Sequence, residues 1–164
     1  MSQLTVRNPL GDDLPSSRVL RRGRVSIGGQ AYHVTSRAHS DTRPFADFRA
    51  ACAICNSFGE TARRSDVQIL AWALMPDHAH WLIELGENAN LSKSVAALKR
   101  RSASAANAVA GIKGASIWQD GFHDRALRRD EDLLTVARYI VANPLRAGLV
   151  SRLGDYPFWD SVWL

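Results

Sequence analysis

Short apolar runs mark the predicted strands of this chain. Residues 67–74 and 78–85 form two such runs, and a proline-containing turn separates them, which predicts a β-hairpin. Residues 25–36 predict an earlier strand that two adjacent glycines interrupt. Residues 116–127 are interpreted as irregular structure or a further strand.

A helix with one apolar face is predicted after the first strand. Asp41 or Thr42 caps its start, Pro44 lies near its first turn, and the helix ends near Arg64. Its two cysteines lie on the apolar stripe, so we interpret them as core residues and not as a zinc or redox site. The apolar positions that share this face are Phe45, Phe48, Cys52, Cys55 and Phe58.

Two further helices are predicted toward the C-terminus. One starts at Asn90 or Ser92 and runs to about residue 109. The other opens at the acidic residues 130–132, which suit the positive end of the helix dipole, and closes before Pro144. The order strand, helix, strand, strand, helix, strand, helix predicts a ferredoxin-like α+β sandwich, an antiparallel sheet with its helices on one face.

Composition then limits the class of protein. The chain has 164 residues, of which 46% are hydrophobic and 23% charged, as in an ordinary globular domain. No apolar run approaches the roughly 18 residues that cross a membrane, and the N-terminus lacks the apolar segment of a secretory signal. Two cysteines fit a reducing cytoplasm. We expect a flexible basic arm at 1–24, a domain at 25–150, and a C-terminal tail at 151–164 that packs on it.

The charge distribution adds a candidate partner. The net charge is +5, and the segment from Pro15 to Arg37 contains arginines but no acid. Clustered guanidinium groups suit the phosphates of a polyanion, although a solvated tail explains the charge equally well. These arginines are Arg18, Arg21, Arg22, Arg24 and Arg37.

A histidine pair in the second hairpin strand is the first candidate for chemistry. His78 and His80 are two residues apart, so a strand places both imidazoles on one face while Ala79 points to the other. Two imidazoles side by side are natural ligands for a divalent metal. They are too few to hold one without a third ligand, and two structural histidines on a polar face explain the pattern as well.

A tyrosine on the last predicted helix is the second candidate. Tyr139 and Asn143 are one turn apart, and side chains at this spacing are neighbours on a helix surface. The phenol and the amide oxygen can therefore enter one site, where Asn143 would be a third metal ligand. A half-buried packing tyrosine is the alternative interpretation.

Several motifs occur in an order and at a spacing typical of one family. The motifs are YHVTSR at 32–37, PDHAH at 76–80, WQDGFHD at 118–124, YIVANPLRAGLV at 139–150 and DYP at 155–157. Together they resemble the single-tyrosine HUH transposases of the insertion-sequence type, and most of all the REP-associated tyrosine transposase branch. The resemblance covers about residues 20–160 and includes Ala38 at a position where relatives usually have glycine.

The resemblance implies a fold, an activity and a set of site residues. It implies the HUH endonuclease fold, with His78 and His80 as metal ligands, Tyr139 as nucleophile and Asn143 as the further ligand, where some relatives have glutamine. The implied metal is Mg²⁺ or Mn²⁺. The implied activity is the nicking and rejoining of single-stranded DNA at hairpins of palindromic repeats, through a 5′-phosphotyrosine intermediate. A monomer is favoured over a homodimer, in a nucleoid-associated cytoplasmic location.

Alternatives to this activity remain open at the level of sequence. A water-using, metal-dependent nuclease and a domesticated, non-catalytic hairpin-binding protein both fit the same scaffold. Trp118 and Phe122 are candidates for stacking on unpaired bases, with core packing as the favoured alternative. His123 is a candidate phosphate or proton-transfer neighbour, and His33 and His39 are interpreted as structural or exposed. The predicted phosphate contacts are Arg21, Arg22, Arg24, Arg37, Lys99 and Arg100, with Arg101 beside them.

Overall fold

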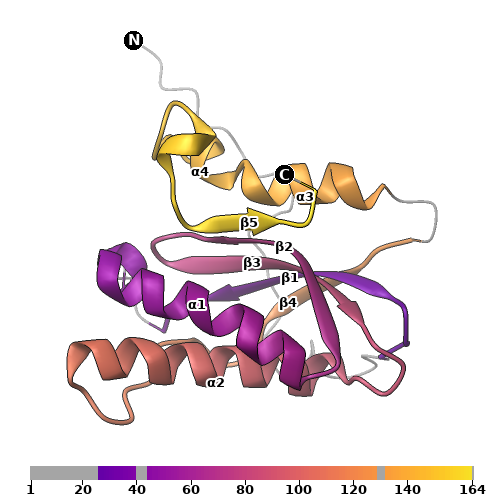
Figure 1. The fold of residues 1–164 in the computed structure, drawn as a ribbon, viewed down its shortest axis with the longest axis horizontal. Helices are drawn as coiled ribbons and strands as arrows, with labels where there is room; N and C mark the ends of the chain where they lie inside the picture. The colour runs from indigo at the N-terminus through magenta and orange to yellow at the C-terminus, as the bar shows by residue number, and fades with distance from the viewer. Residues whose placement is uncertain (1–25, 40–43, 129–131, 164) are drawn as a thin grey trace.

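The structure is a computed structural model that describes residues 26–39, 44–128 and 132–163. A five-stranded antiparallel sheet runs through its centre in the order β4-β1-β3-β2-β5 (Figure 1). The predicted α+β class with an antiparallel sheet is confirmed. The strands are β1 (Ala31–Arg37), β2 (Val67–Leu74), β3 (His78–Leu85), β4 (His123–Ala126) and β5 (Trp159–Ser161).

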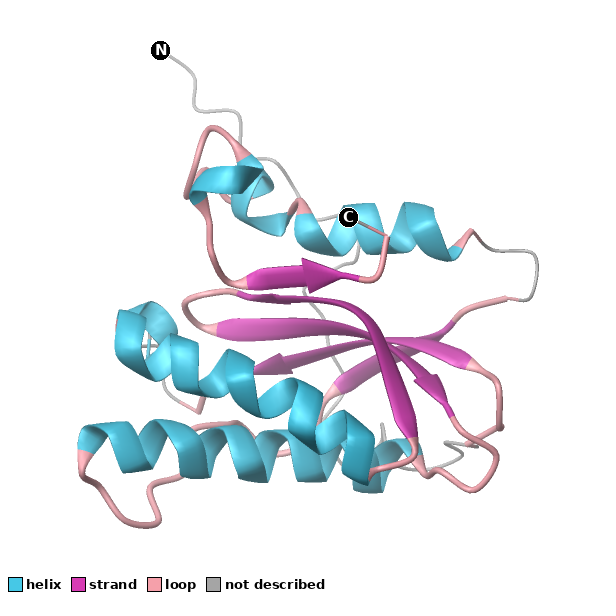
Figure 2. Ribbon diagram, viewed as in Figure 1, coloured by secondary structure: helices cyan, strands magenta, loops and turns pink. Residues whose placement is uncertain are grey.

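Helices cover both faces of the sheet (Figure 2). Helices α1 and α2 pack on the face that contains Trp81, and α3 packs on the face that contains Leu82. Both side chains are fully buried although they are consecutive on β3. The expectation of helices on one face is therefore right for α1 and α2 and wrong for α3, because a strand that is apolar on both faces must be covered on both. The helices are α1 (Phe48–Arg64), α2 (Leu91–Ala110), α3 (Leu133–Val141) and α4 (Asn143–Arg146).

Side-chain caps determine where these helices begin. Asp47 precedes α1 and accepts a hydrogen bond from the Ala50 amide at 2.8 Å, so this residue caps the helix in place of the predicted Asp41 or Thr42, which lie outside the described residues. The predicted first turn at Pro44 belongs to a separate 3₁₀ turn, η1 (Pro44–Ala46). Asn90 caps α2, as predicted, by accepting from the Lys93 amide at 3.0 Å.

The last helical segment is broken into two pieces. Asp132 caps α3, which ends at Val141, and the short helix α4 begins at Asn143 with a proline in its first turn. The prediction that the helix closes before Pro144 is confirmed, but the chain resumes a helical turn at once because proline is compatible with the first turn of a helix.

The residues after α4 complete the sheet. A second 3₁₀ turn, η2 (Leu153–Asp155), leads into β5, which pairs antiparallel with β2. The hydroxyl of Tyr156 donates a hydrogen bond to the carbonyl oxygen of Leu74 at 2.6 Å, where β2 ends. The segment is thereby joined to the strand that leads into the β2–β3 turn.

The longest helix has a mixed surface. α2 spans 20 residues, with Val95 and Leu98 buried and Lys93 and Arg100 exposed. Within the described residues, no helix combines the length and the apolar character that crossing a membrane requires.

The register of the sheet determines which polar side chains meet. Thr35 on β1 lies opposite His80 on β3, and Arg37 lies opposite His78. His123 on β4 lies opposite Thr35 from the other side. Because directly opposed residues of an antiparallel pair point to the same face, these side chains gather on the face that α3 covers.

Candidate active site

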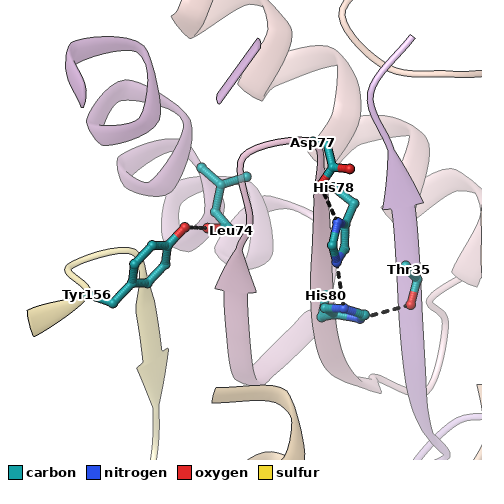
Figure 3. A network of polar contacts seen from close by, with 6 residues as sticks. All are labelled: Thr35, Leu74, Asp77, His78, His80 and Tyr156. Carbon is teal, nitrogen blue, oxygen red and sulfur yellow. Dashed lines mark hydrogen bonds and ion pairs between the residues drawn. The ribbon is translucent and has the colours of Figure 1, made fainter. Parts of the chain in front are cut away.

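Two imidazoles converge on one point at the start of β3. The Nε2 atoms of His78 and His80 lie 3.1 Å apart, and their ring centroids are separated by 4.8 Å (Figure 3). Ala79 between them is fully buried on the opposite face. The predicted side-by-side arrangement follows from the two-residue period of the strand.

Neighbouring groups orient both rings. Asp77 Oδ1 lies 2.7 Å from His78 Nδ1, and Thr35 Oγ1 lies 3.0 Å from His80 Nδ1 (Figure 3). His33 Nε2 is also 3.2 Å from His80 Nδ1. When each Nδ1 carries the proton and donates to its oxygen partner, each Nε2 keeps its lone pair, which is the state that ligates a metal.

Burial keeps the inner imidazoles neutral. Desolvation lowers the pKa of His80 well below its usual value, and the positive charges of nearby histidines and arginines lower it further. Desolvation together with the charge of Arg125 lowers the pKa of His33 from 6.5 to about 4. At neutral pH, both rings therefore have unprotonated nitrogens available.

The pair fits a divalent metal. An octahedral ion with bonds of about 2.1 Å separates neighbouring ligand atoms by about 3.0 Å, close to the observed spacing of the two Nε2 atoms. Within the described residues, no group of three or more histidine, cysteine or acidic side chains is arranged to bind a metal. Amide, phosphate and water oxygens could complete the coordination of such an ion, and a mixed nitrogen and oxygen set suits Mn²⁺.

Asn143 lies at the junction of α3 and α4. Its Nδ2 donates to the carbonyl oxygens of Tyr139 at 3.2 Å and Ile140 at 2.8 Å. The side chain therefore closes the end of α3, and its Oδ1 is the atom that could serve as the predicted ligand.

Tyr139 on α3 lies beside the histidines. Its half-buried ring meets His33 edge to face, with the centroids 6.3 Å apart. The guanidinium carbon of Arg146 on α4 lies 4.3 Å from the centre of the same phenol ring. The structure thus brings Tyr139 into the cluster that contains His80, through His33.

The other two tyrosines are engaged elsewhere. Tyr32 is 2% exposed in the core beneath α1 and α2, and its hydroxyl oxygen accepts a hydrogen bond from the Ile27 amide at 3.3 Å. The hydroxyl of Tyr156 donates to Leu74 O. Among the three tyrosines of the chain, Tyr139 is the one whose ring contacts the histidine cluster.

Three arginines surround the histidines, and only one of them was predicted. Arg37 is exposed at the end of β1, opposite His78, and its charge together with that of Arg146 lowers the pKa of His80. Arg125 lies opposite His33 on β4. The two-residue period of a strand predicts that His123 and Arg125 share one face. The local sequence does not show that this face of the sheet also contains the histidine pair. His33 was likewise interpreted as structural, and its contact with His80 depends on strand pairing.

The other predicted phosphate contacts do not gather at this site. Lys99 Nζ donates to the carbonyl oxygens of Gln119 at 2.5 Å and Gly121 at 2.7 Å, so its ammonium braces a loop. Arg101 pairs with Glu60, whereas Arg100 is exposed and lines a groove with Lys113. The predicted contacts Arg21, Arg22 and Arg24 lie outside the described residues.

The remaining sequence candidates are mostly structural. Trp118 is buried, packs against Phe45 and donates from Nε1 to Ser102 Oγ at 3.0 Å, so the base-stacking alternative is wrong for it and core packing is confirmed. Phe122 and Cys55 pack against the same core, and burial raises the pKa of the Cys55 thiol to about 12. His39 is exposed and His123 is half-buried.

Comparison with known proteins agrees with this geometry. A family model described as "Transposase IS200 like" matches residues 29–143, which include the histidine pair and the candidate nucleophile. The REP-associated tyrosine transposase of Escherichia coli (strain K12) is 31% identical over 93 residues, which are 56% of this chain and 52% of that relative, so the match spans about half of its length.

A structural comparison shows the same fold. A solved structure of a REP-associated tyrosine transposase bound to a REP hairpin matches with a TM-score of 0.68 and 24% identity, over 83% of this chain and 79% of that one. Fold, motif order and family model agree with the resemblance in the sequence. The chain therefore belongs to the IS200-like transposase family.

Proposed function

We propose that this protein nicks and rejoins single-stranded DNA at palindromic hairpins, with Tyr139 as nucleophile and a divalent ion held by His78, His80 and Asn143. The observation that carries the proposal is that the Nε2 atoms of two histidines converge at 3.1 Å, while His33 links one of these rings to the Tyr139 ring of a distant helix. Membership of a transposase family and the hairpin bound by the structural relative support it.

The chain's own residues would perform the transfer. Tyr139 Oη attacks phosphorus in line, and the O–P bond forms as the bond from phosphorus to the 3′ oxygen breaks. The phenol proton passes to water, and the departing 3′ oxygen takes its electron pair and then a proton from solvent. The product is a 5′-phosphotyrosine, which keeps a phosphodiester bond, so a second 3′-hydroxyl can reverse the step without ATP.

A divalent ion in this site would act as a Lewis acid on a non-bridging phosphate oxygen. Asp77, Thr35 and His33 would keep the two ligand rings in the orientation that this ion needs. Mg²⁺ prefers oxygen ligands, so we expect Mn²⁺ to support activity at least as well.

A single-chain site fits the proposed monomer. The ligand pair on β3 and the tyrosine on α3 meet within one chain, through His33. We therefore propose that a monomer suffices for cleavage, in a cytoplasmic protein that associates with the nucleoid.

Covalent trapping tests the proposal. The protein is incubated with end-labelled hairpin DNA and Mn²⁺, denatured, and examined for a protein–DNA band whose attachment residue is mapped by mass spectrometry. We expect attachment at Tyr139, loss of the band in Tyr139→Phe, and its retention in the matched control Tyr156→Phe.

Other outcomes identify the rival functions. Cleavage that survives Tyr139→Phe without an adduct would indicate a water-using nuclease. Hairpin binding with neither cleavage nor adduct in any divalent metal would indicate a non-catalytic DNA-binding protein. Attachment at Tyr32 or Tyr156 would keep the class of enzyme and overturn the assigned site.

A further inference from the structure

Arg146 is a charged residue in contact with the candidate nucleophile. Its guanidinium carbon lies 4.3 Å from the centre of the Tyr139 ring, within the range of a cation–π contact. Arg146 lies on α4, seven residues after Tyr139 and beyond the break that ends α3. The guanidinium therefore covers one face of the phenol while the ring's contact with His33 is edge to face.

A chain of side-chain contacts joins Arg146 to the histidine pair. Arg146 contacts the Tyr139 ring, and that ring contacts His33. His33 contacts both His80 and the Tyr139 ring. Arg146, Tyr139 and His80 thus belong to one cluster, which the proposed reaction requires to surround a phosphate.

No acidic side chain takes up the charge of Arg146 in the described part of the chain. By contrast, Arg64, Arg101 and Arg152 each form an ion pair with a carboxylate. Arg146 is exposed, so its N–H groups are accessible, and their fork matches two oxygens of a phosphate. A phosphate bound beside Tyr139 would lie within reach of these N–H groups.

We propose that Arg146 is a catalytic residue that binds the scissile phosphate with the edge of its guanidinium while its face holds the Tyr139 ring for attack. The inference rests on the proposed function and adds to it a second positive group besides the metal. Negative charge grows on the phosphate oxygens as Tyr139 Oη attacks, and a prearranged donor stabilises that charge more than it stabilises the bound substrate. The loss of Arg146 should therefore slow the chemical step more than it weakens DNA binding.

Single-turnover kinetics test this role. With saturating hairpin and Mn²⁺, we expect Arg146→Gln to slow adduct formation by about 10²–10³-fold, with hairpin affinity changed by less than about fivefold. Arg146→Lys should recover only part of the rate, because an ammonium keeps the charge but lacks the planar face and the fork. The matched control Arg63→Gln removes an exposed arginine from α1, on the other side of the sheet, and should leave the rate unchanged.

A substrate with one uncharged linkage distinguishes phosphate binding by Arg146 from a purely structural role of this residue. In metal-free Tyr139→Phe protein, replacing the phosphate at the mapped cleavage position by an uncharged methylphosphonate should weaken binding severalfold. The same replacement should have no effect when Arg146→Gln is also present. A thermal unfolding midpoint equal to that of wild type confirms that each variant folds.

The outcomes distinguish this inference from the function on which it rests. No adduct with wild-type protein would overturn the proposed function and this role together. An adduct that forms in Arg146→Gln at the wild-type rate, or an equal methylphosphonate effect with and without Arg146, would overturn the role of Arg146 alone.

Discussion

At the scale of single residues, neighbours decide what each imidazole can do. Asp77 and Thr35 each lie within hydrogen-bond distance of an Nδ1 atom, and this leaves both Nε2 atoms facing one another. Burial lowers the pKa values of His80 and His33, so both rings are neutral near pH 7. A pair of exposed histidines without these partners would spend part of its time protonated or turned away.

Asp77 should matter for metal affinity. We expect Asp77→Asn to weaken Mn²⁺ binding by about 10–100-fold, because the amide no longer accepts as strongly from His78 Nδ1 and the ring loses its preferred orientation. Calorimetric titration with Mn²⁺ measures this. Asp160→Asn on β5 is the matched control, and an equal loss in both variants would contradict the orienting role of Asp77.

His33 should make stability depend on pH. Its folded-state pKa, about 4, is below the ordinary 6.5, so the unfolded chain binds the proton first as pH falls. Above pH 6.5, His33 has no effect on the free energy of unfolding. As the pH falls from 6.5 to 4, protonation of the unfolded chain lowers this free energy progressively, by about 3 kcal/mol at pH 4.

Denaturant titrations of metal-free wild type and His33→Gln measure that contribution. Between pH 7 and pH 4, we expect wild type to lose about 2–3 kcal/mol more unfolding free energy than His33→Gln loses. If the unfolding free energies of the two proteins changed in parallel with pH, folding would not lower the pKa of His33.

At the scale of elements, the junction of α3 and α4 assembles one side of the site. Asn143 closes α3 through the carbonyl oxygens of Tyr139 and Ile140, and α4 then presents Arg146 to the Tyr139 ring. The other side is the antiparallel pairing of β1 with β3, which sets Thr35 opposite His80. The site is therefore held by backbone pairing on one side and by a helix junction on the other.

The C-terminal segment should contribute stability and not chemistry. Tyr156→Phe removes the hydrogen bond to Leu74 O and should lower the free energy of unfolding by about 1 kcal/mol, measured by denaturant titration. Adduct formation should persist in this variant. If Tyr156→Phe instead lost the adduct with its stability unchanged, the division of roles between Tyr156 and Tyr139 would be wrong.

At the scale of the whole molecule, the sheet separates a structural face from a chemical one. The larger apolar cluster lies beneath α1 and α2 and contains Trp81 and Phe58. The opposite face has a smaller apolar cluster under α3, and the histidines and arginines lie next to it. The site thus borders this smaller core, against which Tyr139 itself packs.

The excess of positive charge should show in the salt dependence of DNA binding. If Arg21, Arg22 and Arg24 each contact a phosphate of single-stranded DNA, replacing all three by glutamine should reduce the slope of log affinity against log salt by about 2. Hairpin binding measured from low to moderate salt gives this slope.

The matched control replaces three arginines of α1, Arg49, Arg63 and Arg64, by glutamine. An equal decrease in slope for both triple variants would show a general effect of net charge and no specific contact by the N-terminal arginines.

Local patterns in the sequence were sufficient to predict much of the fold and the central histidine pair of the candidate site. The hairpin strands 67–74 and 78–85 were predicted with their observed bounds, because apolar runs and a proline turn are local signals. The shared face of His78 and His80 follows from the period of a strand, and Asn90 as a cap follows from its side-chain oxygen.

Tertiary structure decided which distant groups meet. It determined the face on which α3 packs and the contact of His33 with His80. It also determined the contact of Arg146 with Tyr139 and the hydrogen bonds by which Lys99 braces a loop. All these contacts join segments far apart in the chain or on separate elements. Periodicity shows which side of an element is apolar, but only strand pairing and packing determine what lies against that side. For this protein, the sequence by itself determined the ligand and nucleophile candidates, and the fold determined their neighbours, since those contacts depend on long-range pairing.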